Sequence, residues 1–365
     1  MGTTAAVVVL PQEDGPLRIE TVELPDPGPH QVVVRQFASG ICHSQLHQMH
    51  SSRPGPVVLG HESTGVVIAV GSQVTGASVG ERVMVTWIPR QPLRGRAPQP
   101  IRLPLADGTE AVTTNVFTWA DHTIADEAYV VPLPDWAPTD VTAIIGCAVM
   151  TGAGAVTRTA DVRPGQSVAV FGVGGVGLSA VAAAAITGAD PVIAVDLDPA
   201  KLEMAKRFGA THLVDASRGD AVRAIREITK RPDEPDSDYR PAGGVDVAFD
   251  CIGVKATMEQ ILQATRYGVM GAERGGVAVL VGVPQTNIEL DTRSVLIGEK
   301  SYRGSIGGSC IPERDFPMFL RWYQQDKLDL DSLVTRRYPI SEINEATTEL
   351  AEGRVLGRAI LEFGS

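Results

Sequence analysis

Three glycines with G-x-G-x-x-G spacing carry the clearest chemical signal in this sequence. Gly172, Gly174 and Gly177 follow the apolar run Val168–Phe171 and precede an alanine-rich, helix-forming stretch at 178–187. The first glycine permits a tight turn, the second lets the backbone approach a pyrophosphate, and the third lets helix and strand pack closely. The N-H groups at the start of the helix then face the phosphates.

An acidic residue stands where an adenosine ribose requires one. A second apolar run, 191–195, ends at Asp196, about 20 residues beyond the glycines. A carboxylate there can accept hydrogen bonds from the ribose. The strand, the turn containing Gly175 and Val176, the helix and the acid together predict a dinucleotide-binding unit. The alternative is a chance glycine-rich loop, which the flanking strand and helix disfavour.

Length and charge limit the possible partners. A chain of 365 residues fits two domains, and its net charge of -11 argues against nucleic acid or an anionic membrane as the main partner. Residues 167–189 lack charge and are long enough to span a bilayer. The internal glycines and the absence of a second span or a basic flank favour a buried sheet and helix instead. We expect small-molecule partners.

The cysteines indicate a reducing compartment. There are four, and they are far apart in the sequence, so no disulfide framework is visible. The first fifteen residues lack the basic and apolar regions of a signal peptide. We therefore expect a cytoplasmic protein with reduced thiols.

Periodicity divides the chain into two kinds of structure. Residues 5–134 contain short β-rich runs separated by glycine and proline, which predicts a mainly β domain. An apolar helical pattern covers 140–159, and strands then alternate with helices to about 283, which predicts a parallel sheet with crossover helices. The polar segment 231–244 reads as a mobile, exposed loop. Helical patterns return after Gly307, in a part that we expect to rejoin the first domain.

One stretch of the first domain looks irregular. Between Trp87 and Trp119 there are five prolines and four arginines: Pro89, Pro92, Pro98, Pro100, Pro104, Arg90, Arg94, Arg96 and Arg102. We expect an excursion with little regular structure. Its arginines are best interpreted as a solvated face, with a subunit contact or a rim for anionic substrates as the alternative.

Three side chains before or beside the nucleotide unit could bind a metal ion: Cys42 in GICHSQLH, His61 in GHE and Cys147 in GCAVMTG. Each is a weak candidate by itself. A free cysteine is usually a small buried apolar group, and a lone histidine is usually structural. Spacing alone does not group the three.

The ordered motifs together resemble the zinc-dependent medium-chain alcohol dehydrogenases over nearly the whole chain. The likeness rests on GICHSQLH, LGHESTGVV, VGERV, the 147–151 segment, VFGVGGVGLSA, VDLDPAKLEMAKRFGA, VAFDCIG and VGVP. It implies an α/β protein with a GroES-like, mainly β catalytic domain over 1–150, completed by 307–365. A Rossmann domain with a doubly wound parallel sheet would occupy 151–306.

The same resemblance assigns roles around a metal ion. Cys42, His61 and Cys147 would bind one catalytic zinc ion with an open fourth position, and Glu62 would stand close enough to exchange onto the metal. Ser44 and His47 resemble the relay that carries the alcohol proton to water. A capping hydroxyl and a surface imidazole are the plainer interpretations of these two residues.

Further matched positions concern the cofactor and the substrate. Lys201 resembles the lysine that assists Asp196 at the ribose, which favours NAD over NADP. Arg358 resembles a pyrophosphate partner, while Thr151 and Val283 resemble residues beside the nicotinamide. Trp87 and Trp119 match positions lining a substrate channel, although an ordinary place in the core is an equal alternative for both.

The sequence departs from the family in three ways. It lacks the four clustered cysteines of the family's structural zinc site, so we expect at most one zinc ion per subunit. Gln45 stands where an aspartate usually supports the zinc-bound histidine, and this change could weaken or retune the metal. His43 stands where an arginine often contacts the pyrophosphate, so NAD could be held less tightly.

These features predict an NAD(H)-dependent alcohol dehydrogenase that acts on a small alcohol, aldehyde or ketone and assembles as a homodimer or homotetramer. The alternatives within the superfamily are a formaldehyde or thiol-adduct dehydrogenase and a carbonyl reductase. An alternative of another class is a non-catalytic NAD-binding protein, which is disfavoured because Cys42, His61, Cys147 and Ser44 are all present.

Overall fold

The computed structural model describes residues 2–13, 15–90, 98, 100–113, 116–232, 234, 236–237 and 240–364. The chain folds into two compact units. Unit 1 comprises Met1–Ala148, Ile311–Arg321 and Leu330–Ser365, and unit 2 comprises Val149–Cys310 and Trp322–Asp329. The sequence-based boundaries fell within four residues of these breaks, but they placed 322–329 in the first domain.

Unit 1 is built from mainly antiparallel sheets, in which one pair of strands near the end of the chain is parallel. The largest has the order β10-β6-β5-β3-β18-β17, with β9 also paired to β3. These strands are β3 (Gln31–Ile41), β5 (Glu62–Val70), β6 (Arg82–Thr86), β9 (His122–Asp126), β10 (Val130–Pro132), β17 (Val334–Pro339) and β18 (Arg358–Glu362). A second sheet has the order β2-β1-β4, formed by β1 (Thr3–Leu10), β2 (Arg18–Leu24) and β4 (Val57–Val58). Alternating apolar residues of β1 and β3 are buried in the cores of this unit.

The excursion before Trp119 contains more structure than the sequence predicted. β7 (Ile101–Pro104) and β8 (Glu110–Thr113) form an antiparallel hairpin, so the prediction of little regular structure was wrong for this part. Leu103 and Ala111 are fully buried, and this burial explains why the strands form despite the neighbouring prolines. Arg102 pairs with Glu110 across the hairpin. Pro92, Arg94 and Arg96 lie outside the described residues.

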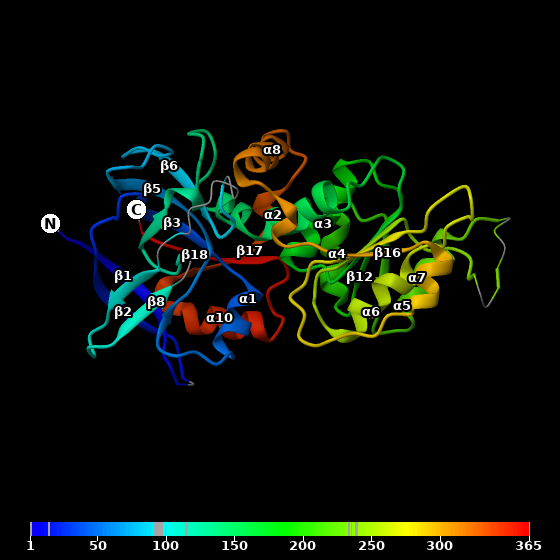
Figure 1. Cartoon of the computed structure of the whole chain (residues 1–365), viewed down its shortest axis with the longest axis horizontal. Helices are drawn as coiled ribbons and strands as arrows, with labels where there is room; N and C mark the ends of the chain where they lie inside the picture. Colours follow the sequence, from blue (N-terminus) through cyan, green and yellow to red (C-terminus); the bar gives the residue numbers. More distant parts are fainter. Residues whose placement is uncertain are drawn as a thin grey trace. The chain divides into compact units, whose positions relative to one another are not determined.

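Unit 2 contains one parallel sheet of six strands in the order β13-β12-β11-β14-β15-β16. The strands are β11 (Val168–Phe171), β12 (Val192–Asp196), β13 (His212–Asp215), β14 (Val247–Asp250), β15 (Val277–Leu280) and β16 (Ser301–Gly304). The crossover helices are α3 (Gly175–Ile186), α4 (Pro199–Arg207), α5 (Ala221–Thr229), α6 (Lys255–Ala264) and α7 (Thr292–Gly298). Figure 1 shows this alternation of strands and helices in green and yellow.

Strand order reverses between β11 and β14, and in open α/β sheets ligands bind beyond the carboxyl ends of the strands at such a point. Ala169 and Phe171 pack with α5 and α6 in one core cluster, while alternate residues of β11 face the other side of the sheet. The predicted doubly wound sheet is confirmed. The segment 231–244, predicted to be mobile, includes residues outside the described part of the chain.

The helical pattern at 140–159 is not one helix. It forms a 3₁₀ helix at Val141–Gly146, α2 (Ala148–Gly154) and a π-helical turn at Ala155–Thr159. The break falls at Cys147, whose φ of -144° is not helical. Because of this break, the Cys147 side chain does not follow the side-chain spacing of a continuous helix.

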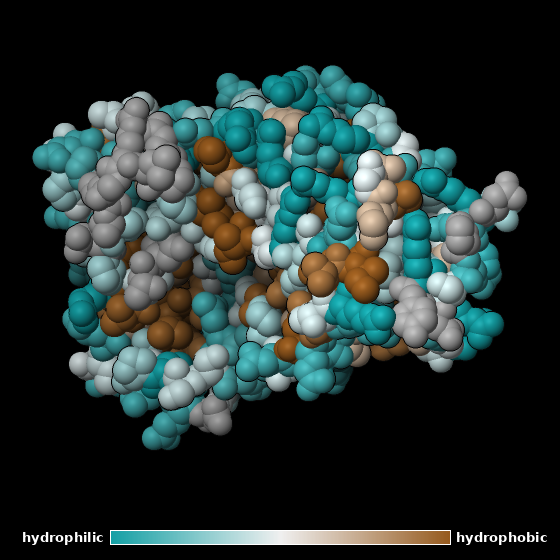
Figure 2. Space-filling view, turned by 45° about the vertical axis from the view of Figure 1, so that its right-hand side comes forward, coloured by the Kyte–Doolittle hydropathy of each residue, from teal (hydrophilic) through white to brown (hydrophobic). Residues whose placement is uncertain are grey.

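The remaining helices include the two predicted after Gly307. They are α1 (His43–Met49), α8 (Pro312–Gln324), α9 (Leu330–Leu333) and α10 (Ile343–Ala351). No helix among the described residues is both long and apolar enough to cross a membrane. On the face drawn in Figure 2, apolar side chains reach the surface in separate groups between hydrophilic ones.

Candidate functional site

Helix α1 positions the first candidate ligand. Cys42 is its N-cap, and Gln45 at the third helical position accepts a hydrogen bond from the Cys42 backbone N-H at 2.9 Å. This contact satisfies one of the donors that every helix leaves unpaired at its N-terminus. Cys42 therefore has a fixed backbone where β3 ends and α1 begins.

The structure brings the three predicted metal ligands together inside unit 1. Cys42 Sγ lies 4.0 Å from Cys147 Sγ, and His61 Nε2 lies 3.2 Å from Cys147 Sγ. All the ligand atoms of this triad lie within 4.8 Å of one another. Tetrahedral zinc with bonds of about 2.0–2.3 Å needs ligand atoms roughly 3.3–3.8 Å apart. Two sulfurs and one imidazole nitrogen at this spacing fit zinc and leave a fourth position for water or substrate.

The charges around the triad favour a thiolate. Hydrogen bonding from Cys147, the positive charge of Arg358 and contact with His61 hold the pKa of Cys42 well below its usual range, against the effect of burial. The pKa of the Cys147 thiol is raised by its hydrogen bond to Cys42 and by burial. One thiolate is thus already favoured before a cation is bound, and a divalent cation stabilises the second.

Glu62 is held by partners other than the triad. Its Oε1 accepts hydrogen bonds from Arg358 Nε at 3.0 Å and from Nη2, and its Oε2 accepts one from the Ala148 N-H at 3.2 Å. Burial raises the pKa of Glu62, although the charge of Arg358 opposes that rise. Burial also opposes ionisation of Arg358, but the acidic groups around it raise its pKa. The predicted exchange of Glu62 onto the metal stays a prediction.

Arg358 has a charged partner within unit 1. The residue is only 5% exposed and forms an ion pair with Glu62. Its predicted contact with the pyrophosphate stays a prediction.

In unit 2 the glycine turn has the predicted conformation. Gly172 has a φ of 83°, which a side chain would disfavour. A Cβ at Gly177 would lie 1.8 Å from the carbonyl oxygen of Gly172, whereas one at Gly174 would meet nothing within 4 Å. Gly177 is therefore required by the protein's own packing, and Gly174 leaves open space where α3 begins.

Asp196 stabilises this turn from the end of β12. Its Oδ2 accepts a hydrogen bond from the Val173 N-H at 2.9 Å, and its Oδ1 accepts from Leu197 and Asp198 N-H groups. The carboxylate that was predicted to meet a ribose thus also connects the end of β12 to the glycine turn.

Comparisons with known proteins agree with both halves of this geometry. Residues 28–135 match the family model "Alcohol dehydrogenase GroES-like domain", and residues 175–325 match "Zinc-binding dehydrogenase". The chain is 33% identical to alcohol dehydrogenase class-3 of Cereibacter sphaeroides, with all of both proteins covered. This chain belongs to the zinc-dependent medium-chain alcohol dehydrogenases.

Two further relatives have different names. S-(hydroxymethyl)glutathione dehydrogenase of Paracoccus denitrificans is 31% identical, with 99% of this chain and 100% of the relative covered. The crystal structure of benzyl alcohol dehydrogenase from Acinetobacter calcoaceticus is 29% identical, with a TM-score of 0.84 over 99% of this chain and all of that one. The recognition of the family and of its two-domain fold is confirmed.

The predicted relay residues of this dehydrogenase lie on α1. Ser44 and His47 are three positions apart, which places them on neighbouring positions of one helix face. The Ser44 hydroxyl is buried and has no hydrogen-bond partner among the described residues. A hydroxyl in that state is available to a ligand.

The two predicted substrate-channel tryptophans differ in their surroundings. The ring of Trp87 is partly exposed and meets the ring of His61 edge-on, with 6.2 Å between centroids. Trp119 is 1% exposed, packs in an apolar core and donates from Nε1 to the Gly40 carbonyl. The geometry fits a channel position for Trp87 and the alternative core position for Trp119.

The remaining predicted cofactor residues are spread over both units. His43 is an exposed first residue of α1. In unit 2, the Thr151 hydroxyl is buried with no partner among the described residues, Lys201 lies in α4, and Val283 is 52% exposed beyond β15. Their contacts with a cofactor stay predictions.

Sequence reasoning missed Asp250. This fully buried carboxylate at the end of β14 accepts hydrogen bonds from the Gly253 N-H at 2.9 Å and the Thr257 hydroxyl at 2.8 Å. It thereby fixes the loop beside Gly172, since a Cβ at Gly172 would meet the Ile252 side chain. A lone acid directly after a buried apolar strand was the signal that could have identified it.

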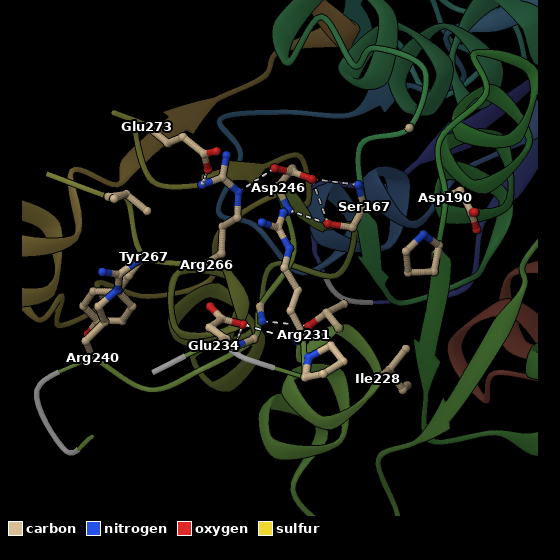
Figure 3. A pocket seen from close by; sticks show the side chains of 17 residues that line it. Ser167, Asp190, Ile228, Arg231, Glu234, Arg240, Asp246, Arg266, Tyr267 and Glu273 are labelled. Carbon is tan, nitrogen blue, oxygen red and sulfur yellow. Dashed lines mark hydrogen bonds and ion pairs between the residues drawn. The ribbon is translucent and has the colours of Figure 1, made fainter. Parts of the chain in front are cut away.

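A cavity of about 580 Å³ lies elsewhere in unit 2 (Figure 3). Ser167, Asp190 and Asp246 line it near the amino ends of β11, β12 and β14, opposite the glycine turn. Asp246 accepts hydrogen bonds from Ser167 and pairs with Arg266 at 2.6 Å. Because Ser167, Asp246 and Arg266 satisfy one another and no predicted site residue lines the cavity, we do not assign the chemistry to it.

Proposed function

We propose that this protein is an NAD(H)-dependent dehydrogenase that interconverts an alcohol with an aldehyde or ketone. The observation that carries the proposal is the group of Cys42 Sγ, His61 Nε2 and Cys147 Sγ, whose ligand atoms lie within 4.8 Å of one another. When bound, zinc lowers the pKa of an alcohol or polarises a carbonyl oxygen. The three side chains would hold the ion and leave one position open.

Two residues of α1 would move the proton. The Ser44 hydroxyl, which has no partner among the described residues, would accept the alcohol proton and release its own, and hydride would pass from the substrate carbon to NAD. His47, on the same face of α1, would pass the proton toward solvent. The hydroxyl and the imidazole each both accept and donate a proton, so the same pair serves reduction in reverse.

The glycine turn would hold the pyrophosphate of NAD, and Asp196 would accept from the ribose 2′-hydroxyl with help from Lys201. A 2′-phosphate would be repelled by this carboxylate, which favours NAD over NADP. We further expect a cytoplasmic protein that forms a homodimer or homotetramer. Sedimentation analysis of the purified protein would check the oligomeric state.

Metal analysis combined with NADH absorbance tests the proposal. The panel should contain linear and aromatic alcohols and their aldehydes, with NAD and NADP, on the wild type and Cys42→Ser. We expect one zinc ion per chain, NAD-linked turnover and loss of both in the variant. A protein with stoichiometric zinc but no hydride transfer across the panel would falsify the assignment and favour the non-catalytic alternative.

A thiol-adduct dehydrogenase is the second candidate because two similar proteins are named S-(hydroxymethyl)glutathione dehydrogenase. The aromatic wall that Trp87 forms beside His61 is better suited to a flat apolar substrate, so we place simple and aromatic alcohols first. Comparing kcat/KM for S-hydroxymethylglutathione and benzyl alcohol separates the two, and a higher value for the adduct would reverse this order.

A further inference from the structure

Two neighbours fix the direction in which the Gln45 side-chain amide points. Gln45 is 1% exposed, and its Oε1 accepts the Cys42 backbone N-H at 2.9 Å. A backbone N-H is always a donor, so the atom facing it has to be the amide oxygen. The amide NH₂ group is therefore the one that faces His61 Nδ1, with which it forms a hydrogen bond.

This orientation selects one form of the imidazole. Because His61 Nδ1 accepts a hydrogen bond from an amide, the neutral ring carries its proton on Nε2, which faces Cys147 Sγ at 3.2 Å. Zinc needs the lone pair of that same Nε2, because this is the ring nitrogen within the triad. The ring favoured by Gln45 is thus the form that cannot bind the metal.

Zinc binding then costs one hydrogen bond, whichever way the Gln45 amide is oriented. If the ring proton moves to Nδ1, it meets the NH₂ group of Gln45, and two donors face each other. If the amide turns by half a rotation, Nδ1-H gains an oxygen, but the Cys42 N-H now faces the NH₂ group. A glutamine has one acceptor atom for two donors on opposite sides, whereas a carboxylate has two.

We propose that Gln45 is a positioning residue that lowers the zinc affinity of this chain by favouring the wrong tautomer of His61. The inference rests on the zinc site of the proposed function. It makes the metal of this dehydrogenase more exchangeable than a carboxylate at position 45 would allow.

Zinc affinities of the metal-free, full-length chain test the inference, measured by competition with a chromogenic chelator. Gln45→Glu offers an oxygen to each donor, and we expect it to bind zinc about 10- to 100-fold more tightly than the wild type. Gln45→Met is the neutral control of similar length. Since it removes the amide that favours the non-binding tautomer, we expect its affinity to equal or exceed that of the wild type, whereas loss of an ordinary supporting residue costs about 10- to 100-fold.

The ring tautomer provides a second readout that added charge alone would not move. Histidine ¹⁵N shifts of metal-free protein, assigned with His61→Asn, should show the proton on Nε2 in the wild type and on Nδ1 in Gln45→Glu. A wild-type proton on Nδ1, a gain below about tenfold in Gln45→Glu, or a loss above about threefold in Gln45→Met would overturn the inference.

The outcome is separable from that of the proposed function. A chain that shows these affinities and tautomers but transfers no hydride supports the inference and contradicts the enzymatic assignment. If neither the wild type nor Gln45→Glu binds zinc, both are overturned.

Discussion

Glu62 in unit 1 and Asp196 in unit 2 are both carboxylates at predicted sites, but they meet different partners. Glu62 pairs with the guanidinium of Arg358, a side chain 296 positions away in the sequence. Asp196 accepts three backbone N-H groups of its own turn region. A site built from side chains depends on each distant partner residue, whereas a site built from backbone groups depends on the conformation that the backbone can adopt. The two units should therefore respond to different substitutions.

Removing Arg358 should have the largest effect. In Arg358→Met, Glu62 remains buried without its cation, which costs about 3–5 kcal/mol of unfolding free energy. Denaturation followed by tryptophan fluorescence measures this loss, since Trp87, Trp119 and Trp136 lie in unit 1. The double variant Glu62→Gln/Arg358→Met should recover most of it. A single-variant loss under about 1 kcal/mol, the usual size for an exposed pair, would contradict the contrast.

A methyl group in the glycine turn should act through the backbone. In Gly177→Ala, the new Cβ meets the Gly172 carbonyl, and we expect unit 2 to lose about 1–3 kcal/mol of stability. Gly174→Ala is the matched control, because its Cβ meets no protein atom within 4 Å. It should keep its stability within about 0.5 kcal/mol and yet bind NADH at least about fivefold more weakly in a fluorescence titration. Equal losses of stability in both variants would refute this division of roles.

Substitution of Asp196 should change cofactor preference. Asp196→Asn retains the shape of the side chain but loses the charge that disfavours a 2′-phosphate, so the NAD-to-NADP ratio of kcat/KM should fall about tenfold or more. The variant should also lose some thermal stability. An amide has only one oxygen, so it cannot accept from the Val173 N-H on one side and from the Leu197 and Asp198 N-H groups on the other. An unchanged cofactor ratio would show that Asp196 serves only the turn.

The smallest expected effect concerns a buried cation of unit 2. Lys300 is 5% exposed and donates to the Leu262 and Thr265 carbonyls. Burial lowers its pKa to about 7; the positive charge of Arg226 lowers it further, and the negative charge of Asp291 opposes the change. Above that pH the folded chain releases a proton that the unfolded chain keeps until about pH 10.4, so stability rises with pH in this window.

Lys300→Met lacks this linkage. Relative to the variant, the wild type should therefore gain about 1 kcal/mol between pH 7 and pH 8. Chemical denaturation at the two pH values measures the stability difference between wild type and variant. If this difference does not change with pH, Lys300 stays charged in the folded chain, held by its two carbonyl partners and by the Tyr267 ring, whose centroid is 4.2 Å away.

Sequence predicted the nucleotide unit in more detail than the metal site, for a physical reason. Its signals are local: β11 has the bounds that the apolar run predicted, and the turn follows directly from the glycines. Cys42 and Cys147 are 105 positions apart, so only the family resemblance grouped them with His61. The dual contact of Gln45 also needed coordinates, because its partner His61 comes from another segment.

The hairpin at 101–113 shows a different cause of error. Asp107 and Gly108 between two apolar runs are a turn signal, but the surrounding prolines suggested irregular structure. Burial of Leu103 and Ala111 outweighs that local preference. In the same way, the break at Cys147 interrupts a stretch whose apolar pattern indicated one helix.

The long sequence separation of the triad also affects how unit 1 unfolds. All four cysteines are free thiols, so no covalent bond within the chain ties these segments together. An ion held by Cys42, His61 and Cys147 would close loops of up to 105 residues and act as a removable cross-link, whose benefit comes from restricting the unfolded chain. A chelator would then lower the melting temperature of unit 1 as well as the activity.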